Sequence, residues 1–320
     1  MKTVKNIFLI IVSTFLLSLT GYGQSSETGT TSAAFLKLGA GARAAAMGNS
    51  GVAISSGADA LYWNPSLLGL QSNSDVLISY NKWIAETHNS FIGLTMPTSA
   101  GTFGFGILAF ASGEMTRTKA IPGQNMPYTE ESSFWNIDGA LYAGYGVDVY
   151  KNTCFGISAK GIYQNLAEES FAGFAVDLGL STKFAVNDFG FSVGFAVNNI
   201  GPKMKYTHEE VDLPLMITGG ASIRFYHDQA LVSVTGGSID KNTQIKFGGE
   251  FTPIEYVSLR VGYRTGLEDV NGDITGITAG LGLQYSGLKL DYAYNAYGDL
   301  GHVHVISLGL IPSMLNNAGK

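Results

Sequence analysis

Two spacings in this chain could bind a metal ion, and neither is complete. His302 and His304 lie two residues apart, so on a strand they share a face and could supply two ligands of a zinc site. No third ligand is identifiable, and we expect solvated or interfacial histidines. Residues 268–273 (EDVNGD) are acidic, but an EF-hand calcium loop would need a glycine directly after Asp273 and a distal glutamate. Asn271-Gly272 indicates a turn, and we expect no metal.

Nucleotide binding and catalysis lack the sequence context that they require. The run Gly39-Ala40-Gly41-Ala42-Arg43-Ala44 loosely fits the fingerprint of a dinucleotide-binding site. Asp59 follows at the spacing of the acidic residue that binds the ribose in such sites. That fingerprint needs a preceding strand and a surrounding βαβ unit, and neither is predicted here. We interpret the glycines as sites of close packing. No serine stands in a nucleophile elbow and no histidine has an evident serine partner, so we expect no enzyme and no cofactor.

The N-terminus has the pattern of a secretory signal. Lys2 and Lys5 precede an apolar run from Ile7 to Leu19, and Gly21-Tyr22-Gly23 supplies small residues for cleavage. We expect residues 1–23 to be a signal peptide that is removed after Gly23. No long apolar stretch follows, which argues against a transmembrane helix, and Cys154 is the only cysteine, so no internal disulfide is expected.

Composition favours a membrane β-barrel. Only 14% of the 320 residues are charged, against roughly 25% in an ordinary soluble domain. The 42 glycines and 16 tyrosines suit a barrel wall, in which small residues line the lumen and aromatic rings lie at the membrane interfaces. The formal net charge of −6 argues against nucleic acid as a partner.

Alternation of apolar and polar residues recurs in about fourteen segments. In residues 288–295 (LKLDYAYN), four apolar side chains face one way, while Lys289, Asp291, Ala293 and Asn295 face the other. The apolar face carries almost no charge, as contact with lipid requires. A soluble sandwich or lipocalin-like barrel is the alternative. We predict strands at 75–83, 89–97, 101–112, 134–150, 153–166, 170–186, 189–200, 214–226, 229–238, 242–251, 255–266, 274–285, 288–297 and 302–311.

The connections alternate between short and long. Tight turns are predicted at Lys151-Asn152, Asn187-Asp188 and Ser286-Gly287, whereas 112–133 and 201–213 are long. Short periplasmic turns opposite long extracellular loops are typical of an outer-membrane barrel. The fold class is therefore all-β, a transmembrane antiparallel barrel of about 14 strands formed by residues 75–320. We expect this barrel to lie in the outer membrane, where its outer face contacts lipid.

Residues 24–74 do not alternate, yet they are too apolar for a solvated tail. We predict that they form a plug inside the lumen. Arg43 is then expected to pair with a lumen carboxylate such as Asp138, Asp177, Glu250 or Asp291, direct contact with a ligand being the alternative. Asn64-Pro65 is expected to fix a turn, because the residue before proline is disfavoured in a helix.

Two runs of this segment carry a family resemblance. Residues 33–48 (AAFLKLGAGARAAAMG) and 58–65 (ADALYWNP) resemble the opening of the PorV/PorQ family of outer-membrane proteins, distant relatives of the FadL fatty-acid transporters. The motif residues are Phe35, Gly39, Gly41, Arg43, Gly48, Asp59, Trp63, Asn64 and Pro65. Ser66-Leu67-Leu68 stands where the family pattern has Ala-Gly-Leu. The resemblance spans the mature chain and implies a FadL-like barrel.

The resemblance implies a role in type IX secretion. PorV-like members bind the C-terminal signal domains of secreted proteins and carry them from the translocon to a cell-surface attachment complex, while PorQ-like members anchor a component of that complex. Which subfamily applies stays open, and passage of small hydrophobic compounds, as in FadL, is the alternative function. Extracellular loops rich in Met and aromatic residues suit protein binding, and an ordinary lid over the barrel is the alternative for these loops. The candidate contacts are Met115, Ile121, Met126, Tyr128, Met204 and Tyr206.

Overall fold

The computed structural model describes residues 31–121, 128–166, 169–267 and 274–315. The expected signal peptide, residues 1–23, lies outside these ranges, as do Met126 and the acidic run 268–273. No helix among the described residues is long and apolar enough to span a membrane.

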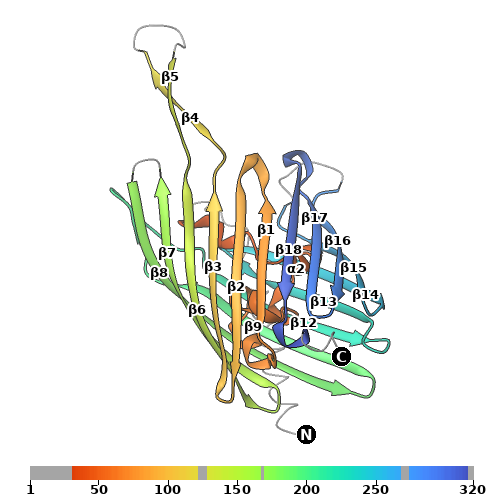
Figure 1. The fold of residues 1–320 in the computed structure, drawn as a ribbon. Helices are drawn as coiled ribbons and strands as arrows, with labels where there is room; N and C mark the ends of the chain where they lie inside the picture. The colour runs from red at the N-terminus through yellow and green to blue at the C-terminus, as the bar shows by residue number, and fades with distance from the viewer. Residues whose placement is uncertain (1–30, 122–127, 167–168, 268–273, 316–320) are drawn as a thin grey trace.

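Fourteen antiparallel strands form one closed barrel, in which the first strand pairs with the last. Figure 1 shows the wall from the side. The predicted fold class is thus confirmed, and every predicted strand is present. The strands are β1 (Asp75–Lys82), β2 (His88–Thr98), β3 (Gly101–Ala111), β6 (Ile137–Tyr150), β7 (Thr153–Leu166), β8 (Glu169–Val186), β9 (Phe189–Ile200), β12 (Met216–Phe225), β13 (Ala230–Ile239), β14 (Asn242–Ile254), β15 (Val257–Arg264), β16 (Ile277–Tyr285), β17 (Leu288–Ala296) and β18 (His302–Leu310).

The two faces of the wall follow the alternation of the sequence. In β17, Leu288 and Leu290 are exposed on the outside, whereas Ala293 and Asn295 are buried inside the barrel. In β15, Leu259 and Val261 point outward and Arg260 points inward. The outer surface is therefore a continuous apolar band, which suits lipid, and the charged strand residues are directed to the lumen.

Tight turns close one end of the barrel. Lys151-Asn152, Asn187-Asp188 and Ser286-Gly287 join neighbouring strands there, and Lys151 and Asn152 adopt positive φ angles of 45° and 64°. The opposite end, at the top of Figure 1, carries the longer connections, but two are short: β8 begins three residues after β7 ends, and Asp240-Lys241 is a two-residue turn between β13 and β14.

Two connections predicted as loops contain strands of their own. Within residues 112–136, β4 (Met115–Ala120) pairs with β5 (Tyr128–Phe134), and this hairpin rises above the rim in Figure 1. Within residues 201–215, β10 (Met204–Lys205) pairs with β11 (Glu210–Val211). The alternation rule missed both pairs because it detects strands with one apolar face, and β5 in particular is exposed along almost its whole length.

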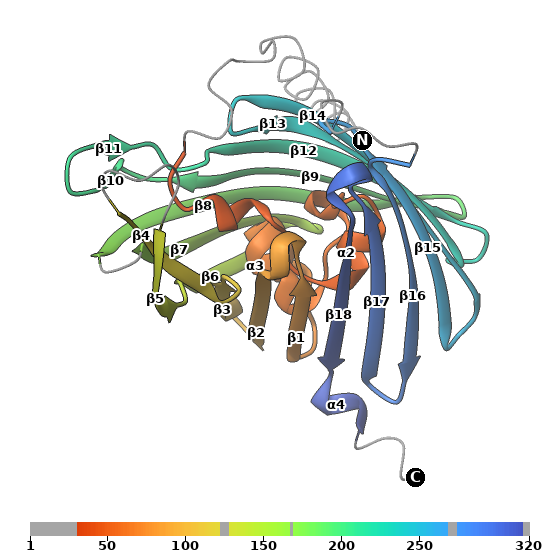
Figure 2. The same cartoon turned by 90° about the horizontal axis from the view of Figure 1, so that it is seen from above.

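Residues 31–74 lie inside the ring of strands, as Figure 2 shows from above, and we call them the plug. The plug consists of short helical pieces: η1 (Ala34–Lys37), α2 (Ala42–Ala46), η2 (Gly51–Ala53), η3 (Gly57–Asp59), α3 (Ala60–Trp63) and η4 (Pro65–Leu70). Its apolar side chains, among them Leu36, Leu61 and Leu67, are fully buried against inward-facing wall residues such as Phe91 and Leu108. The described part of the predicted plug segment, residues 31–74, thus lies in the lumen.

Candidate functional site

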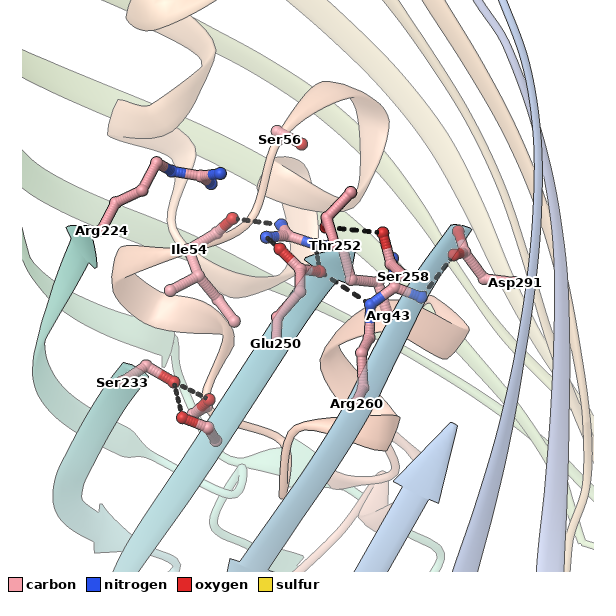
Figure 3. Close-up of polar contacts among 12 residues, drawn as sticks. Arg43, Ile54, Ser56, Arg224, Ser233, Glu250, Thr252, Ser258, Arg260 and Asp291 are labelled. Carbon is pink, nitrogen blue, oxygen red and sulfur yellow. Dashed lines mark hydrogen bonds and ion pairs between the residues drawn. The ribbon is translucent and has the colours of Figure 1, made fainter. Parts of the chain in front are cut away.

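A chain of four charged side chains joins the plug to the wall (Figure 3). The Arg43 guanidinium of α2 donates from Nε and Nη2 to the two carboxylate oxygens of Glu250 in β14, at 2.7 and 2.8 Å. Arg260 of β15 donates from Nε to the same carboxylate at 2.7 Å and from Nη1 to Asp291 of β17 at 2.5 Å. Of the carboxylates that the sequence offered to Arg43, the structure selects Glu250.

Local structure explains how these groups meet. Gly41 has a φ of +84° at the start of α2, which turns the chain so that Arg43 projects toward β14. Glu250 and Arg260 are directly opposite each other in the β14–β15 ladder, and both occupy inward positions. Arg43 is also fixed by the Ile54 carbonyl, which accepts from Nη1 at 2.7 Å. Each charge of this network therefore has a partner of opposite sign.

A second group of polar contacts holds helix η3 of the plug through the carboxylates of Asp75 and Asp59. The Asp75 carboxylate at the start of β1 accepts from the backbone N–H of Ala58 at 3.0 Å and pairs with Lys289 at 3.3 Å. Asp59 completes a capping box, in which its carboxylate accepts from the Ser56 N–H at 3.0 Å. These two carboxylates cap the N-terminal end of η3, so Asp59 serves to hold the plug backbone.

The glycines of the plug serve two different purposes. Gly39 has a φ of +96°, a left-handed conformation that side-chain-bearing residues rarely adopt. Gly48 combines a φ of +67° with close contact: a Cβ there would lie 2.7 Å from the carbonyl oxygens of Phe247 and Tyr263. Close packing was inferred from the sequence for Gly39 and Gly41, where a Cβ would lie 3.3 Å from Asn49 Oδ1 and 3.5 Å from Asp59 Oδ2; the tightest packing is instead at Gly48, and backbone conformation dominates at Gly39.

Trp63, Asn64 and Pro65 fix the turn between α3 and η4. Asn64 has an extended backbone (φ −163°), and Pro65 opens η4, as the rule for the residue before proline predicts. The fully buried Asn64 amide donates to the Val52 carbonyl at 2.8 Å, while its Oδ1 accepts from the Ser66 N–H at 3.1 Å. The Trp63 indole N–H donates to the Ala40 carbonyl at 2.8 Å. Phe35 is buried in the apolar core of the plug.

The plug also forms a hydrogen bond at the seam of the barrel, where the last strand, β18, pairs with the first, β1. The backbone N–H of Ala42 donates to the Ser307 hydroxyl of β18 at 2.7 Å, and that hydroxyl donates to Ser79 of β1 at 3.0 Å. These three residues form a hydrogen-bonded link across the pairing of the last strand with the first.

Several buried ionic and cation–π contacts were not foreseen from the sequence. Lys160 of β7 pairs with the fully buried Asp177 of β8 at 2.9 Å. Lys246 lies over the Trp63 ring at 6.0 Å, and Arg264 lies over the Tyr297 ring at 4.2 Å. The signal available was the presence of a cation in the inward register of each strand, but the period alone does not identify the partner.

Little space separates the plug from the wall on the side of β1, β17 and β18. Two cavities there measure about 10 Å³, beside Gly39 and Phe91, and about 40 Å³, beside Asp59 and Ser307. Larger cavities lie at the two ends of the barrel. Two of them lie together at the tight-turn end: one of about 540 Å³ is lined by Arg43 and Glu250, and one of about 350 Å³ adjoins it.

The candidate contacts in the first long loop are exposed where the structure describes them. Tyr128 is 60% exposed and Ile121 37% exposed on the β4–β5 hairpin, and Met115 stands at its base. Trp135, which the sequence argument did not select, is 63% exposed beside them. The hairpin pairs with no other strand of the described chain, so its side chains are open to a partner.

Of the candidate contacts in the second long loop, Met204 is buried and Tyr206 is half-buried, as the alternative of a lid over the barrel predicts. Met204 is only 1% exposed, because the β10–β11 hairpin folds back and its side chain packs on the backbone of Gly173 in β8. Tyr206 is half-buried: its hydroxyl donates to Gln164 at 2.5 Å and its ring packs on Phe171. This loop closes over the plug and is not an open protein-binding surface at these positions.

The two adjacent histidines lie on the outer face near the long-loop rim. The rings of His302 and His304 meet edge to face, with centroids 5.0 Å apart. His304 hydrogen-bonds to the Tyr292 hydroxyl at 2.7 Å, and His302 stacks on Tyr294. Tyrosine and histidine in this position suit an interfacial aromatic girdle, and the described residues contain no cluster of three metal-ligating side chains.

Comparison with known proteins gives a family for the N-terminal part and a fold for the whole. Residues 22–96 match the family described as the type IX secretion system protein PorV. The Pseudomonas putida toluene transporter TodX (12% identity) and the Ralstonia pickettii toluene transporter TbuX (14% identity) each superpose with a TM-score of 0.57. The alignments cover 85% of this chain and 96% and 98% of those proteins.

No curated protein sequence matches the chain significantly. The structural likeness at this level of identity defines the fold, and the matching region includes the plug motif and the first wall strands. Residues 22–96 thus match the PorV family, and the chain has the barrel fold of the TodX and TbuX structures.

Proposed function

We propose that this protein is a non-enzymatic component of type IX secretion that binds protein partners through its extracellular face. The partners are secreted proteins, through their C-terminal signal domains, or the cell-surface attachment complex. In this proposal residues 1–23 are a cleaved export signal, the plug domain begins at residue 24 and continues to residue 74, and the tight turns of the barrel face the periplasm.

The observation that carries the proposal is the β4–β5 hairpin. A two-stranded ribbon is marginally stable by itself in water, and this one rises beyond the wall with exposed apolar residues, Ile121 and Tyr128, and with Trp135 at its base. Such side chains are typical of protein interfaces. The plug supports the same interpretation, because buried ion pairs and apolar contacts fix it inside the lumen, as a scaffold requires.

The hairpin can be removed without opening the barrel. At its base the Ser112 N–H donates to the Asn136 carbonyl at 2.9 Å, so residues 114–134 can be replaced by a short glycine-containing turn that keeps this bond. We expect the shortened protein to insert normally and to lose its secreted partner in affinity purification from mild detergent, followed by mass spectrometry. A double substitution, Ile121→Ser with Tyr128→Ser, should show the same loss. Undiminished recovery of the partner would refute the proposal.

A control keeps loss of binding separate from loss of folding. Thr129→Ser changes an exposed residue of the same strand and should leave partner recovery unchanged. Heat-dependent gel mobility, which distinguishes a folded barrel from an unfolded one, should be the same for all variants.

Passage of small hydrophobic compounds is the second candidate, and one cavity favours it. A space of about 440 Å³ lies at the long-loop end between β9 and β12, lined in part by Ile200, Leu213, Leu215 and Ile217. The β8–β9 ladder is irregular nearby, between Val176 and Leu178. Uptake of toluene by cells producing the protein tests this candidate. If the protein acts only in secretion, cells that produce it should take up toluene no faster than cells that lack it. Faster uptake that the substitution Leu215→Trp reduces would favour transport.

A further inference from the structure

Two lumen cations at the tight-turn end have no acidic partner among the residues that the structure describes. Arg43, Lys160, Arg260 and Lys289 each have a carboxylate oxygen within 3.3 Å. Lys183 of β8 and Arg224 of β12 form no ion pair in the described chain, and this pair is the subject here.

The contacts of Lys183 and Arg224 leave most of their donors unused. Arg224 donates from Nη1 to the Asp228 backbone carbonyl at 3.2 Å, which occupies one N–H of a guanidinium that carries five. No hydrogen bond is formed by the Lys183 ammonium within the described residues. The carboxylates of Asp228 and Glu255 line the same cavity without forming an ion pair with either cation.

The strand register brings these two cations to either side of a glycine. β9 lies between β8 and β12 in the barrel; Lys183 is opposite Ser192 of β9, and Arg224 is opposite Gly190. Strands two apart are separated by roughly 10 Å, a span that a lysine and an arginine side chain can bridge together. A Cβ at Gly190 would meet only the Arg224 Cβ, at 3.6 Å, so the surface between the cations is open.

Lys183 and Arg224 line both cavities at the tight-turn end, the one of about 540 Å³ and the one of about 350 Å³. The larger cavity is also lined by neutral hydrogen-bonding side chains: Ser56, Gln229, Thr252, Ser258 and Gln284. In Figure 3, Arg224 extends from its strand into the lumen on the side of Ile54. Two cations with free N–H groups, an open floor between them and nearby neutral hydrogen-bonding groups meet the requirements for binding an oxyanion.

We propose that Lys183 and Arg224 bind a phosphate group above Gly190, at the tight-turn mouth of the lumen. The arginine would give paired N–H donors to two phosphate oxygens, and the lysine would supply a point charge. The phosphate can belong to free inorganic phosphate or to a phospholipid headgroup. This inference is independent of the secretion function, because the site lies at the opposite end of the barrel from the β4–β5 hairpin.

Titration of the purified full-length mature protein in a non-ionic detergent with sodium phosphate, at constant ionic strength, tests the proposal by calorimetry. Lys183→Gln and Arg224→Gln should each weaken phosphate binding at least tenfold. Lys151→Gln is the matched control, because it removes an exposed lysine from a turn at the same end and should change nothing.

A third variant separates the cradle from general charge. Gly190→Leu keeps both cations but fills the space between them, so it should abolish phosphate binding. Heat-dependent gel mobility confirms that the variants form barrels. Phosphate binding that is equal in the wild-type protein and in the Lys183, Arg224 and Gly190 variants would overturn the proposal.

The two sources of phosphate are distinguished in mixed micelles. Native mass spectrometry with phosphatidylglycerol, compared with diacylglycerol of the same acyl chains, detects retention of a phosphate headgroup. Retention of phosphatidylglycerol that depends on Arg224, without binding of free phosphate, would assign the site to a lipid. Absence of both forms of binding in the wild-type protein would refute the site altogether.

Discussion

Replacing Glu250 with glutamine removes the carboxylate on which the plug network is centred. That carboxylate accepts three charge-assisted hydrogen bonds, two from Arg43 and one from Arg260, and its side chain is only 7% exposed. Glutamine keeps the shape but leaves two guanidinium groups facing each other without a charge between them. Removing one partner of a buried pair costs about 3–5 kcal/mol, and we expect a loss in that range.

The loss should appear in the plug and not in the wall. Arg43 is a plug residue, whereas every wall strand retains its backbone ladder, so opening of residues 42–63 is the step that becomes easier. Hydrogen exchange of peptides from this segment, measured by mass spectrometry in detergent, should accelerate by about 160- to 5,000-fold or until the plug is fully open. Peptides from β6 and β7 should be unchanged and serve as the internal control.

Two further variants test the charge argument itself. Arg43→Met leaves Glu250 paired with Arg260, so it should open the plug less than Glu250→Gln does. Arg43→Met combined with Glu250→Met removes both charges of the central pair while Arg260 keeps Asp291, and it should recover part of the loss. Unchanged exchange in Glu250→Gln, or a double variant that is worse than either single one, would show that the network does not hold the plug.

Three other changes should act on the plug by different means. Gly48→Ala meets two wall carbonyls at a φ of +67° and should cost about 2–4 kcal/mol, whereas Gly161→Ala, which has open space, should be nearly neutral; proteolysis of the plug compares them. Asn64→Ala leaves the amide partners in the turn unsatisfied and should cost about 2–4 kcal/mol in the plug-opening free energy measured by hydrogen exchange. Lys160→Met leaves the Asp177 carboxylate buried without a cation and should lower the thermal stability of the barrel by about 3–5 kcal/mol, and adding Asp177→Asn should recover part of it.

The wall could be predicted from the sequence because its physical rules are local. Each strand needs an apolar residue at every second position to face lipid, and residues such as Asn187-Asp188 and Ser286-Gly287 mark the tight turns between strands. The predicted strand at 170–186 differs from β8 by one residue. The predicted strand at 242–251 was shorter than β14, because an irregularity between Phe251 and Ile254 interrupts the alternation there.

The contacts inside the lumen could not be predicted in the same way. The sequence offered four carboxylates to Arg43, and only the curvature of the closed wall decides which lies within reach. Met204 was misjudged for a similar reason: its burial depends on contact with Gly173, a residue far away in the chain. The β4–β5 hairpin has solvent around it, so no apolar period marks its strands.

The link from Ala42 through Ser307 to Ser79 sets a condition on the order of assembly. The two strands that it joins stand at opposite ends of the wall sequence, so this seam forms only after the whole barrel has been synthesised. Contacts between residues so far apart in the chain carry a large entropic cost and form slowly. Because the Ala42 N–H donates to the β18 side of this seam, a barrel that closes without its plug in place lacks one partner of the Ser307 hydroxyl. The plug is therefore part of the structure that joins the two ends of the wall.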